Sequence, residues 1–320
     1  MQLGNGILVE VEGHKYRFDP KRVLPSETSM VSHAHSDHLP SSFRHDELVC
    51  SEITRDYLSL RCKKDARVVS DRRVTMIDAG HVPGSTMFLL CGETRVLYTG
   101  DFCTRDKAHT KGARPRKCDV LITEATYGKP HYVFPDYEEM MSAVRDWLGD
   151  IVGRGGSAVL LAYPFGKSQE LAIALRDMPI AFHPSIAENN AVLARHGYNI
   201  PVRQLDPHLA RRQPVVYVTS GYGRDFAGVQ VLRKRGAKVA AFSGWALDRE
   251  FIRSSVADEA FPLSDHCGFD ELMEFVRRCA PSKVFTTHGF AREFAMHVRS
   301  ELGIDAQPLL SRQRTLDHFC

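Results

Sequence analysis

The chain has 320 residues, of which 43% are hydrophobic and 25% charged, a composition typical of globular proteins with a sizeable core. Its 42 Lys and Arg residues exceed the 39 Asp and Glu residues by three, too weak a bias to indicate a nucleic-acid partner by itself. No apolar run reaches the roughly 18 residues that cross a membrane, and the first residues alternate in polarity as a strand does, unlike a signal peptide. The eight cysteines form no Cys-x-x-Cys pair. Together these features predict reduced thiols, a cytoplasmic location and no membrane partner.

Strand patterns dominate the chain up to about residue 125. Short apolar or alternating runs that end in polar loops predict strands at 7–13, 14–20, 28–35, 47–51, 66–70, 74–80, 85–92, 94–101 and 118–126. An amphipathic helix with an acidic first turn follows at 136–153, and strands and helices then alternate up to residue 244. Near residue 263 the chain returns to a histidine-bearing loop, followed by a helix at 269–280, a strand at 283–287 and a closing helix. This order predicts a β-rich domain interrupted by an α/β insertion.

The segment VSHAHSDHLP places four candidate metal ligands within six residues, directly after a short apolar strand. In an extended segment residues i and i+2 project to the same side, so His33 and His35 can hold one ion. Asp37 and His38 lie beyond the turn, where they can face a second ion. Imidazole and carboxylate together suit zinc, and also manganese or iron, better than calcium or magnesium. Incidental histidines in a polar loop are the alternative, which the density of the cluster disfavours.

Three more candidate ligands stand where predicted strands end. His81 follows VTMIDAG, Asp101 ends VLYTGD, and His288 follows KVFTT. A lone histidine at a strand end is more often a hydrogen-bonded structural residue than a ligand, but the recurrence of this context favours a shared site. Since one oxygen of Asp101 could contact each of two ions, the sequence predicts two metal ions, with zinc preferred.

The HxHxDH, DAGH-x-PGS, YTGD and THG motifs resemble those of the metallo-β-lactamase fold, a four-layer αβ/βα sandwich that holds one or two metals along a sheet edge. The resemblance implies one ligand set for each ion, with a bridging Asp101: His33, His35 and His81 for the first, and Asp37, His38 and His288 for the second. It also implies that Asp19, in YRFDP, supports the histidine loop without binding metal.

The region from TEATYG to PLSDHCGF resembles the β-CASP branch of this fold, which comprises nucleases acting on RNA or DNA. The hallmark of that branch is an α/β domain inserted between an acidic residue, here Glu124, and a histidine, here His266. The implied fold class is α/β, with a metallo-β-lactamase αβ/βα sandwich at 1–128 and 264–320 and a β-CASP domain at 129–263. LLAYPFGKSQE, SGW and VFTTHGF extend the resemblance to bacterial ligase-associated DNA exonucleases and to archaeal mRNA 3′-end-processing factors.

The resemblance implies a metal-dependent nuclease that hydrolyses phosphodiester bonds of single-stranded or end-exposed nucleic acid. A DNA exonuclease of a repair pathway with a functional link to a DNA ligase is preferred, and an RNA endo- or exonuclease of the 3′-end-processing type remains open. In the implied mechanism two zinc ions activate a shared water, Asp37 orients it, His266 protonates the leaving oxygen and Glu124 fixes His266. A thioester or lactone hydrolase is disfavoured by the insertion, and a non-catalytic nucleic-acid-binding protein is disfavoured by the complete ligand set.

Gly166, Lys167 and Ser168 stand between a predicted strand and a predicted helix, as the end of a Walker A loop does. The complete motif needs a glycine at position 161, where this chain has leucine. Nucleotide hydrolysis is therefore not predicted. The start of the helix, with Lys167 and Ser168, is instead a candidate contact for a phosphate of the substrate.

Overall fold

The computed structural model describes residues 2–41, 47–63, 65–206, 213–220, 225–254 and 257–309 of the chain. Two compact units divide it: unit 1 consists of Met1–Thr104, Gly112–Val133 and His266–Cys320, and unit 2 of Arg105–Lys111 and Phe134–Asp265. The sequence predicts an insertion at 129–263, whereas unit 2 runs from 134 to 265 and adds 105–111. Lys107 and His109 of that short segment are buried, and both lie near Asp265 of unit 2.

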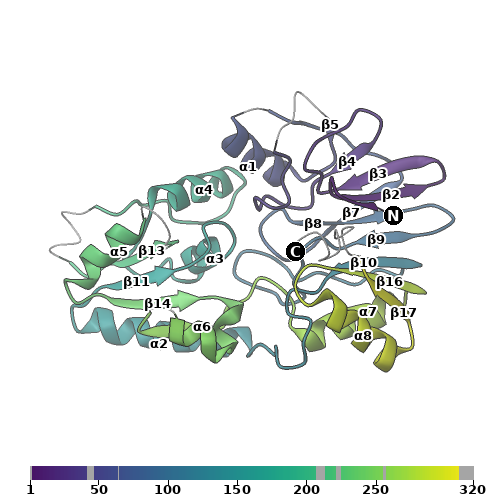
Figure 1. Cartoon of the computed structure of the whole chain (residues 1–320). Coiled ribbons are helices and arrows are strands. Elements are labelled where there is room, and N and C mark those ends of the chain that lie inside the picture. Colours follow the sequence, from purple (N-terminus) through teal and green to yellow (C-terminus); the bar gives the residue numbers. More distant parts are fainter. Residues whose placement is uncertain are drawn as a thin grey trace, which may run out of the picture. The chain divides into compact units, whose positions relative to one another are not determined.

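Unit 1 contains two principal sheets, a strand pair and three described helices (Figure 1). The four-stranded sheet has the order β1-β2-β3-β4, with strands Gln2–Leu3, Ile7–Val11, His14–Phe18 and Thr28–Met30. The six-stranded sheet has the order β17-β16-β10-β9-β8-β7, with, in that order, strands Asp305–Pro308, Lys283–Thr287, Val120–Glu124, Val96–Tyr98, Thr86–Leu90 and Val74–Asp78. The pair consists of β5 (Glu47–Leu48) and β6 (Arg67–Val68), and the helices are α1 (Glu52–Cys62), α7 (Phe269–Cys279) and α8 (Ala291–Leu302).

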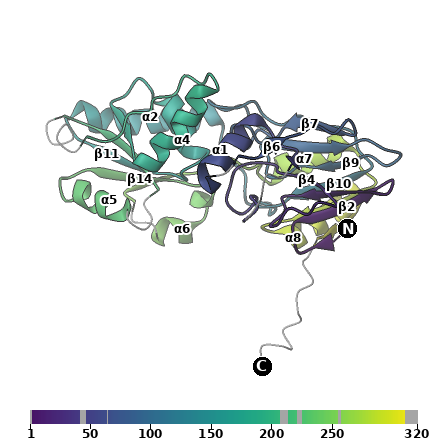
Figure 2. The ribbon, with the colours of Figure 1, turned by 90° about the horizontal axis from the view of Figure 1, so that it is seen from above.

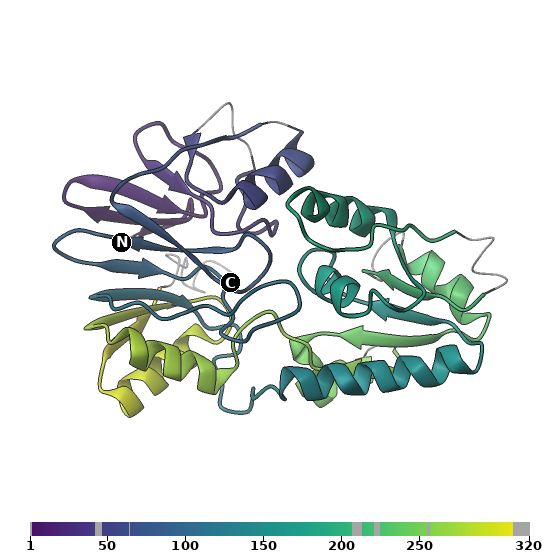
Figure 3. The ribbon, with the colours of Figure 1, turned by 180° about the vertical axis from the view of Figure 1, so that it is seen from behind.

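The six-stranded sheet is buried on both faces, because alternate residues of a strand point to opposite sides. On β8, Phe88 and Leu90 pack in a core that includes Phe18 of the four-stranded sheet, whereas Met87 packs on the other face, with residues of α7 and α8. Leu97 of β9 belongs to the same helix-side core as Met87. Figures 1 and 3 show α7 and α8, drawn in yellow-green, against this face of the sheet.

Helix α1 lies in a third core of unit 1. The helix begins after Ser51, whose side chain accepts a hydrogen bond from the backbone N–H of Thr54. Its Leu58 packs in a cluster with Val31, which follows β4, and Leu48 of β5. Helices thus accompany both sheets, and the predicted metallo-β-lactamase-type architecture with an inserted domain is confirmed.

Unit 2 is built on a five-stranded sheet whose neighbouring strands are all parallel. Its order is β12-β13-β11-β14-β15, with, in that order, strands Ile180–Phe182, Val216–Thr219, Ala158–Leu161, Lys238–Phe242 and Glu259–Phe261. The connecting helices are α2 (Tyr137–Gly153), α3 (Lys167–Ala174), α4 (Pro184–Arg195), α5 (Asp225–Arg233), α6 (Arg249–Ser254) and the 3-10 helix η2 (Gly244–Leu247). Figure 2 shows α2 and α4 on one face and α5 and α6 on the other, the arrangement predicted by alternating strands and helices.

Two of the general expectations concern thiols and membranes. The seven cysteines within the described ranges are free thiols. No helix in the part of the chain that the structure describes has both the length and the hydrophobicity needed to cross a membrane. The cytoplasmic location stays a prediction.

Candidate metal centre

The candidate ligands gather at one edge of the six-stranded sheet. Strands β9, β10 and β16 are parallel, and β7 shares their direction because both β7 and β9 pair antiparallel with β8. The carboxyl ends of these four strands therefore meet at the same edge, at or just before His81, Asp101, Glu124 and His288. The four-stranded sheet delivers the histidine loop, residues 33–38, from the end of β4.

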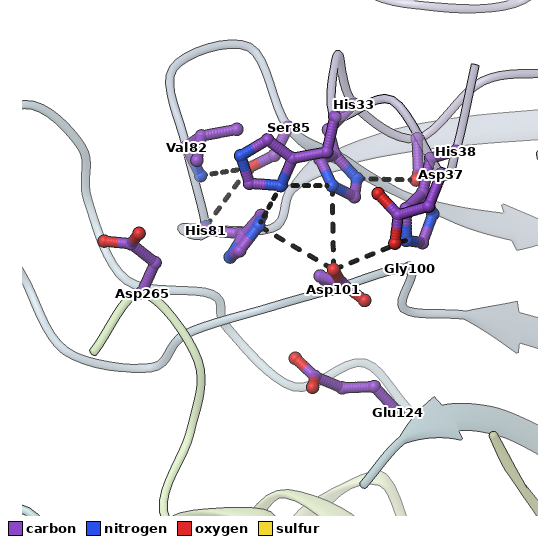
Figure 4. A network of polar contacts seen from close by, with 12 residues as sticks. His33, Asp37, His38, His81, Val82, Ser85, Gly100, Asp101, Glu124 and Asp265 are labelled. Carbon is purple, nitrogen blue, oxygen red and sulfur yellow. Dashed lines mark hydrogen bonds and ion pairs between the residues drawn. The ribbon is translucent and has the colours of Figure 1, made fainter. Parts of the chain in front are cut away.

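Three imidazoles and one carboxylate converge in the first group. Nε2 of His33 and Nε2 of His81 lie 3.0 and 3.1 Å from Nδ1 of His35. Oδ2 of Asp101 lies 3.6 and 3.8 Å from the same two Nε2 atoms. Figure 4 shows His33, His81 and Asp101 pointing toward one another. A tetrahedral zinc ion with nitrogen and oxygen ligands spaces them about 3.4 Å apart, so these atoms already have the spacing of a metal shell.

Asp19 and Ser32 fix the orientation of His33. The hydroxyl of Ser32 donates to Oδ2 of Asp19 at 2.8 Å, so its oxygen accepts from Nδ1–H of His33 at 3.0 Å. This network leaves the lone pair of His33 on Nε2, the atom that faces the cluster. Tyr98 also donates to Oδ2 of Asp19, at 2.7 Å. Burial and the neighbouring imidazoles hold the pKa of His33 well below its usual range, which keeps the ring in the neutral form that binds metals.

His38, Asp101 and His288 form a second group, with ligand atoms within 4.8 Å of one another. Nδ1–H of His38 donates to Asp19 at 2.7 Å. Against the opposing effect of burial, the carboxylates of Asp101 and Asp19 hold the pKa of His38 well above its usual range, so a metal ion at Nε2 would displace a proton there. Within the described part of the chain this buried Nε2 finds no hydrogen-bond partner, and Oδ2 of Asp101 lies 3.4 Å away. Oδ2 of Asp37, on a side chain that is 67% exposed, lies 3.6 Å from the same Nε2. A buried ring nitrogen beside two carboxylates suits a metal ion, and Asp101 belongs to both groups.

Glu124 and His266 form a close pair beside these groups. Nδ1 of His266 lies 2.9 Å from each carboxylate oxygen of Glu124. The backbone N–H of Phe102 and the hydroxyl of Thr126 donate to the same carboxylate, which is 1% exposed. The ring centroid of His266 lies 4.5 Å from that of His81. With Nδ1–H held by Glu124, Nε2 is the nitrogen that can exchange a proton with a substrate.

Lys167 and Ser168 both have protein partners within unit 2. Nζ of Lys167 donates to Oδ2 of Asp265 at 2.8 Å. Ser168 is fully buried, and its hydroxyl donates to the backbone carbonyl of Tyr163 at 2.8 Å. The contact of these two side chains with a substrate phosphate stays a prediction.

Sequence reasoning missed several supporting residues. Ser32 and Tyr98 directly precede His33 and the TGD motif, and this adjacency is the signal that could have found them. A further group in unit 2, His109, Glu170 and Asp265, also brings its ligand atoms within 4.8 Å. These three residues are dispersed along the chain, so no local pattern marks them.

Comparisons with known proteins relate this chain to a family model and to several larger proteins. A family model described as "Zn-dependent metallo-hydrolase RNA specificity domain" matches residues 259–307. A "Probable DNA ligase" of Opitutus terrae is 35% identical over 301 residues, which are 88% of this chain and 29% of that protein. "Endoribonuclease YSH1" of Mycosarcoma maydis is 34% identical over 169 residues, with 52% and 18% covered. The human "DNA cross-link repair 1A protein" is 25% identical over 295 residues, with 80% and 28% covered. The chain thus spans less than a third of the length of each of these relatives.

The sheet-edge histidines and aspartates, the two-sheet unit and the family match define a protein of the metallo-β-lactamase fold. The inserted parallel α/β unit and these relatives narrow the class further. The chain belongs to the β-CASP branch of that family.

Proposed function

We propose that the chain is a metal-dependent nuclease that hydrolyses phosphodiester bonds of single-stranded or end-exposed DNA, as an exonuclease of a repair pathway. The observation that carries this proposal is the pairing of buried Glu124 with His266 beside two groups of candidate metal ligands that share Asp101. The relative named as a DNA ligase matches 88% of the chain, which supports DNA as the substrate and a functional link with a ligase.

Two zinc ions are the proposed cofactors, with manganese or iron as alternatives. His33, His35 and His81 would hold the first ion, Asp37, His38 and His288 would hold the second, and Asp101 would serve both. Metal ions bound there supply an activated water and neutralise the charge of the phosphodiester.

The protein's own residues supply proton transfer and orientation. His266 is the proposed general acid, which donates a proton from Nε2 to the leaving oxygen. Glu124 accepts from Nδ1–H of His266 and favours the protonated ring, because a carboxylate beside an imidazole stabilises its positive charge. Phe102 and Thr126 hold the carboxylate of Glu124 in place by donating to it. Asp37, largely exposed beside His38, is proposed to orient the attacking water.

Incubation of the metal-loaded protein with end-labelled single- and double-stranded DNA and RNA tests this proposal. We expect nucleotides to be released from the ends of DNA, and EDTA to abolish their release. Cleavage of RNA alone would favour the RNA-processing alternative, which the matching RNA specificity domain and the endoribonuclease relative support. Turnover of thioesters or lactones alone would reject the nuclease assignment.

A further inference from the structure

A group of charged side chains is buried within unit 2, and apart from the predicted phosphate contact of Lys167 the proposed reaction does not use it. Lys107 comes from the segment 105–111, Lys167 and Glu170 from α3, and Asp265 from the last position of the unit. The side chains of Lys107 and Asp265 are 1% exposed, and that of Lys167 is 13% exposed. Burying ionised groups is costly unless they are paired, so this arrangement requires a physical reason.

Asp265 is the centre of the group. Nζ of Lys167 donates to one of its carboxylate oxygens at 2.8 Å, and Nζ of Lys107 lies 3.8 Å from the other. Nη2 of Arg105 donates to the backbone carbonyl of Ser264 at 3.1 Å. Three cationic side chains from two segments of unit 2 thus hold residues 264 and 265.

The residue after Asp265 is His266. On the other side of that histidine, the backbone N–H of Cys267 donates to the carbonyl of Phe102 at 3.1 Å. The residues on either side of His266 are therefore each anchored within their own unit, and Glu124 accepts a hydrogen bond from its ring. A general acid has to meet the leaving oxygen within hydrogen-bond reach, and a displacement of about 1 Å can cost on the order of 10²-fold in rate.

We propose that Lys167 and Lys107 are positioning residues for the general acid. They hold the carboxylate of Asp265 and thereby the backbone from which the side chain of His266 extends. This inference rests on the proposed role of His266 in nuclease activity. A buried ion pair is weak evidence of a stabilising role, since apolar side chains of similar size often stabilise a protein as well, so positioning is another reason for retaining this pair.

A metal ion is the competing explanation, because His109, Glu170 and Asp265 bring their ligand atoms within 4.8 Å. Two ammonium groups already face the carboxylate of Asp265, and a divalent cation would add to their charge. Burial raises the pKa of Glu170 to about 7, against the opposing effect of Lys107, so this carboxyl is only partly ionised at neutral pH. The positive charges of the group therefore already match or exceed its negative charges, which disfavours a cation.

The kinetic test compares two phosphodiester substrates in Lys167→Met and Lys167→Arg. One substrate is a single-stranded DNA oligonucleotide, and the other is a nitrophenyl phosphodiester, whose leaving group hardly needs a proton. For Lys167→Met we expect kcat on DNA to fall about tenfold with KM within about twofold, and the rate on the nitrophenyl substrate to change by less than about threefold. Lys167→Arg keeps the charge and should restore most of kcat.

Lys238→Met is the matched control, because Lys238 is 58% exposed and lies 3.7 Å from Asp258 at the surface of the same unit. It should behave as the unchanged protein on both substrates. Equal losses on both substrates in Lys167→Met would show a general structural role and overturn the inference. A rise in KM with kcat unchanged would overturn the inference and indicate a phosphate contact instead. Unchanged kinetics would overturn it as well.

A second readout does not depend on nuclease activity. In protein with isotope-labelled histidine, the ring resonances of His266 can be assigned from their loss in His266→Gln. We expect these resonances to move in Lys167→Met and to stay in place in Lys238→Met. Resonances that stay in place in both variants would overturn the inference. If the unchanged protein cleaves no nucleic acid, the proposed function fails, and the resonances of His266 still decide whether Lys167 positions it.

Discussion

Two regions of the molecule gather histidines and carboxylates whose ligand atoms lie within 4.8 Å of one another. They differ in the charged groups that surround them and in how the histidine rings are oriented. At the sheet edge of unit 1, His33, His35 and His81 converge on Asp101. In unit 2, His109, Glu170 and Asp265 also bring their ligand atoms within 4.8 Å of one another. The first group has hydrogen-bonding partners that turn nitrogen lone pairs inward, whereas the second has two lysine ammonium groups beside its carboxylate.

The difference teaches that the proximity of ligand-type residues does not define a metal site. In unit 1, Ser32 and Asp19 engage the outer ring nitrogens of His33 and His38, so that the inner nitrogens of these two histidines face the candidate ion positions. In unit 2, the cation that Asp265 requires is already supplied by the chain, as Lys167 and Lys107. We therefore expect metal in the first region and internal ion pairing in the second.

The largest expected effect separates the two regions by metal content. Asp101→Ala should reduce the bound metal from about two ions per chain to less than one and lower nuclease activity by more than about 10³-fold, because both ligand groups share this carboxylate. Elemental analysis of protein purified without chelator measures the ions. Asp265→Asn is the control and should keep the full content. Loss of an ion in Asp265→Asn would make the unit 2 group a metal site and break the comparison.

The next effect concerns the pair beside the first region. His266→Ala should lower kcat on DNA by about 10²–10⁴-fold while keeping both metal ions, because it removes a proton donor and no proposed ligand. With a nitrophenyl phosphodiester the defect should shrink by about tenfold, and Glu124→Gln should have an intermediate effect on DNA. The kcat of the variant on DNA and on the nitrophenyl substrate, together with elemental analysis of its metal content, tests these expectations. A metal ion missing from His266→Ala would show that His266 is a ligand, since it lies within ligand distance of Asp101.

A smaller effect is expected from the residue that orients the ligands. Asp19→Asn keeps the shape of the side chain but weakens its acceptance from Ser32 and His38, so metal affinity should fall by about 10–100-fold. Competition with a chelator of known affinity gives the value. Asp78→Asn, a substitution at the end of β7, is the control and should leave the affinity unchanged. If Asp19→Asn bound metal as tightly as the unchanged protein, the orientation of the histidine rings by Asp19 would not distinguish the two regions.

The residues of the first region could be singled out from the sequence because they follow a local rule, and their role as metal ligands stays a prediction. His33 and His35 are two positions apart, and His81, Asp101 and His288 each follow a strand of the same sheet. Strand direction brings such residues to one edge, so a pattern of strand ends is enough to assemble them. The α/β insertion was predictable for the same reason, since alternating strands and helices specify a parallel sheet.

The second region could not be predicted, because its members are brought together only by tertiary packing. Lys107 lies in Arg105–Lys111, a short stretch of unit 2 between two parts of unit 1, and Asp265 is the last residue of unit 2. In the sequence Lys167 follows a strand and opens a helix, which is also the position of a phosphate-binding lysine. The burial of its partner Asp265, which no local pattern reveals, is the reason for proposing a positioning role for Lys167.

The smallest effect tests the charge of the second region directly. Burial raises the pKa of Glu170 to about 7 from its ordinary 4.5, so the folded chain binds this proton more tightly than the unfolded chain does. The stability that the neutral carboxyl contributes is thus fully present below pH 4.5 and is lost as the pH rises through about 7. Glu170→Gln cannot ionise, so its Tm should exceed that of the unchanged protein by a few degrees at pH 8, with the gap closing toward pH 5.

Thermal unfolding followed by circular dichroism at pH 5, 6, 7 and 8 gives these differences. Glu139→Gln, at an exposed position of α2, should shift the Tm by a similar amount at every pH. If the Tm difference between Glu170→Gln and the unchanged protein were also the same at every pH, Glu170 would already be ionised at pH 5. Only a group that titrates within this range makes the Tm difference depend on pH. Two carboxylates would then balance the two ammonium groups, and a cation at His109 would regain part of its electrostatic support. A gap that opens between pH 5 and 8 instead leaves the second region with excess positive charge at neutral pH, which is the condition that separates it from the metal-binding edge of unit 1.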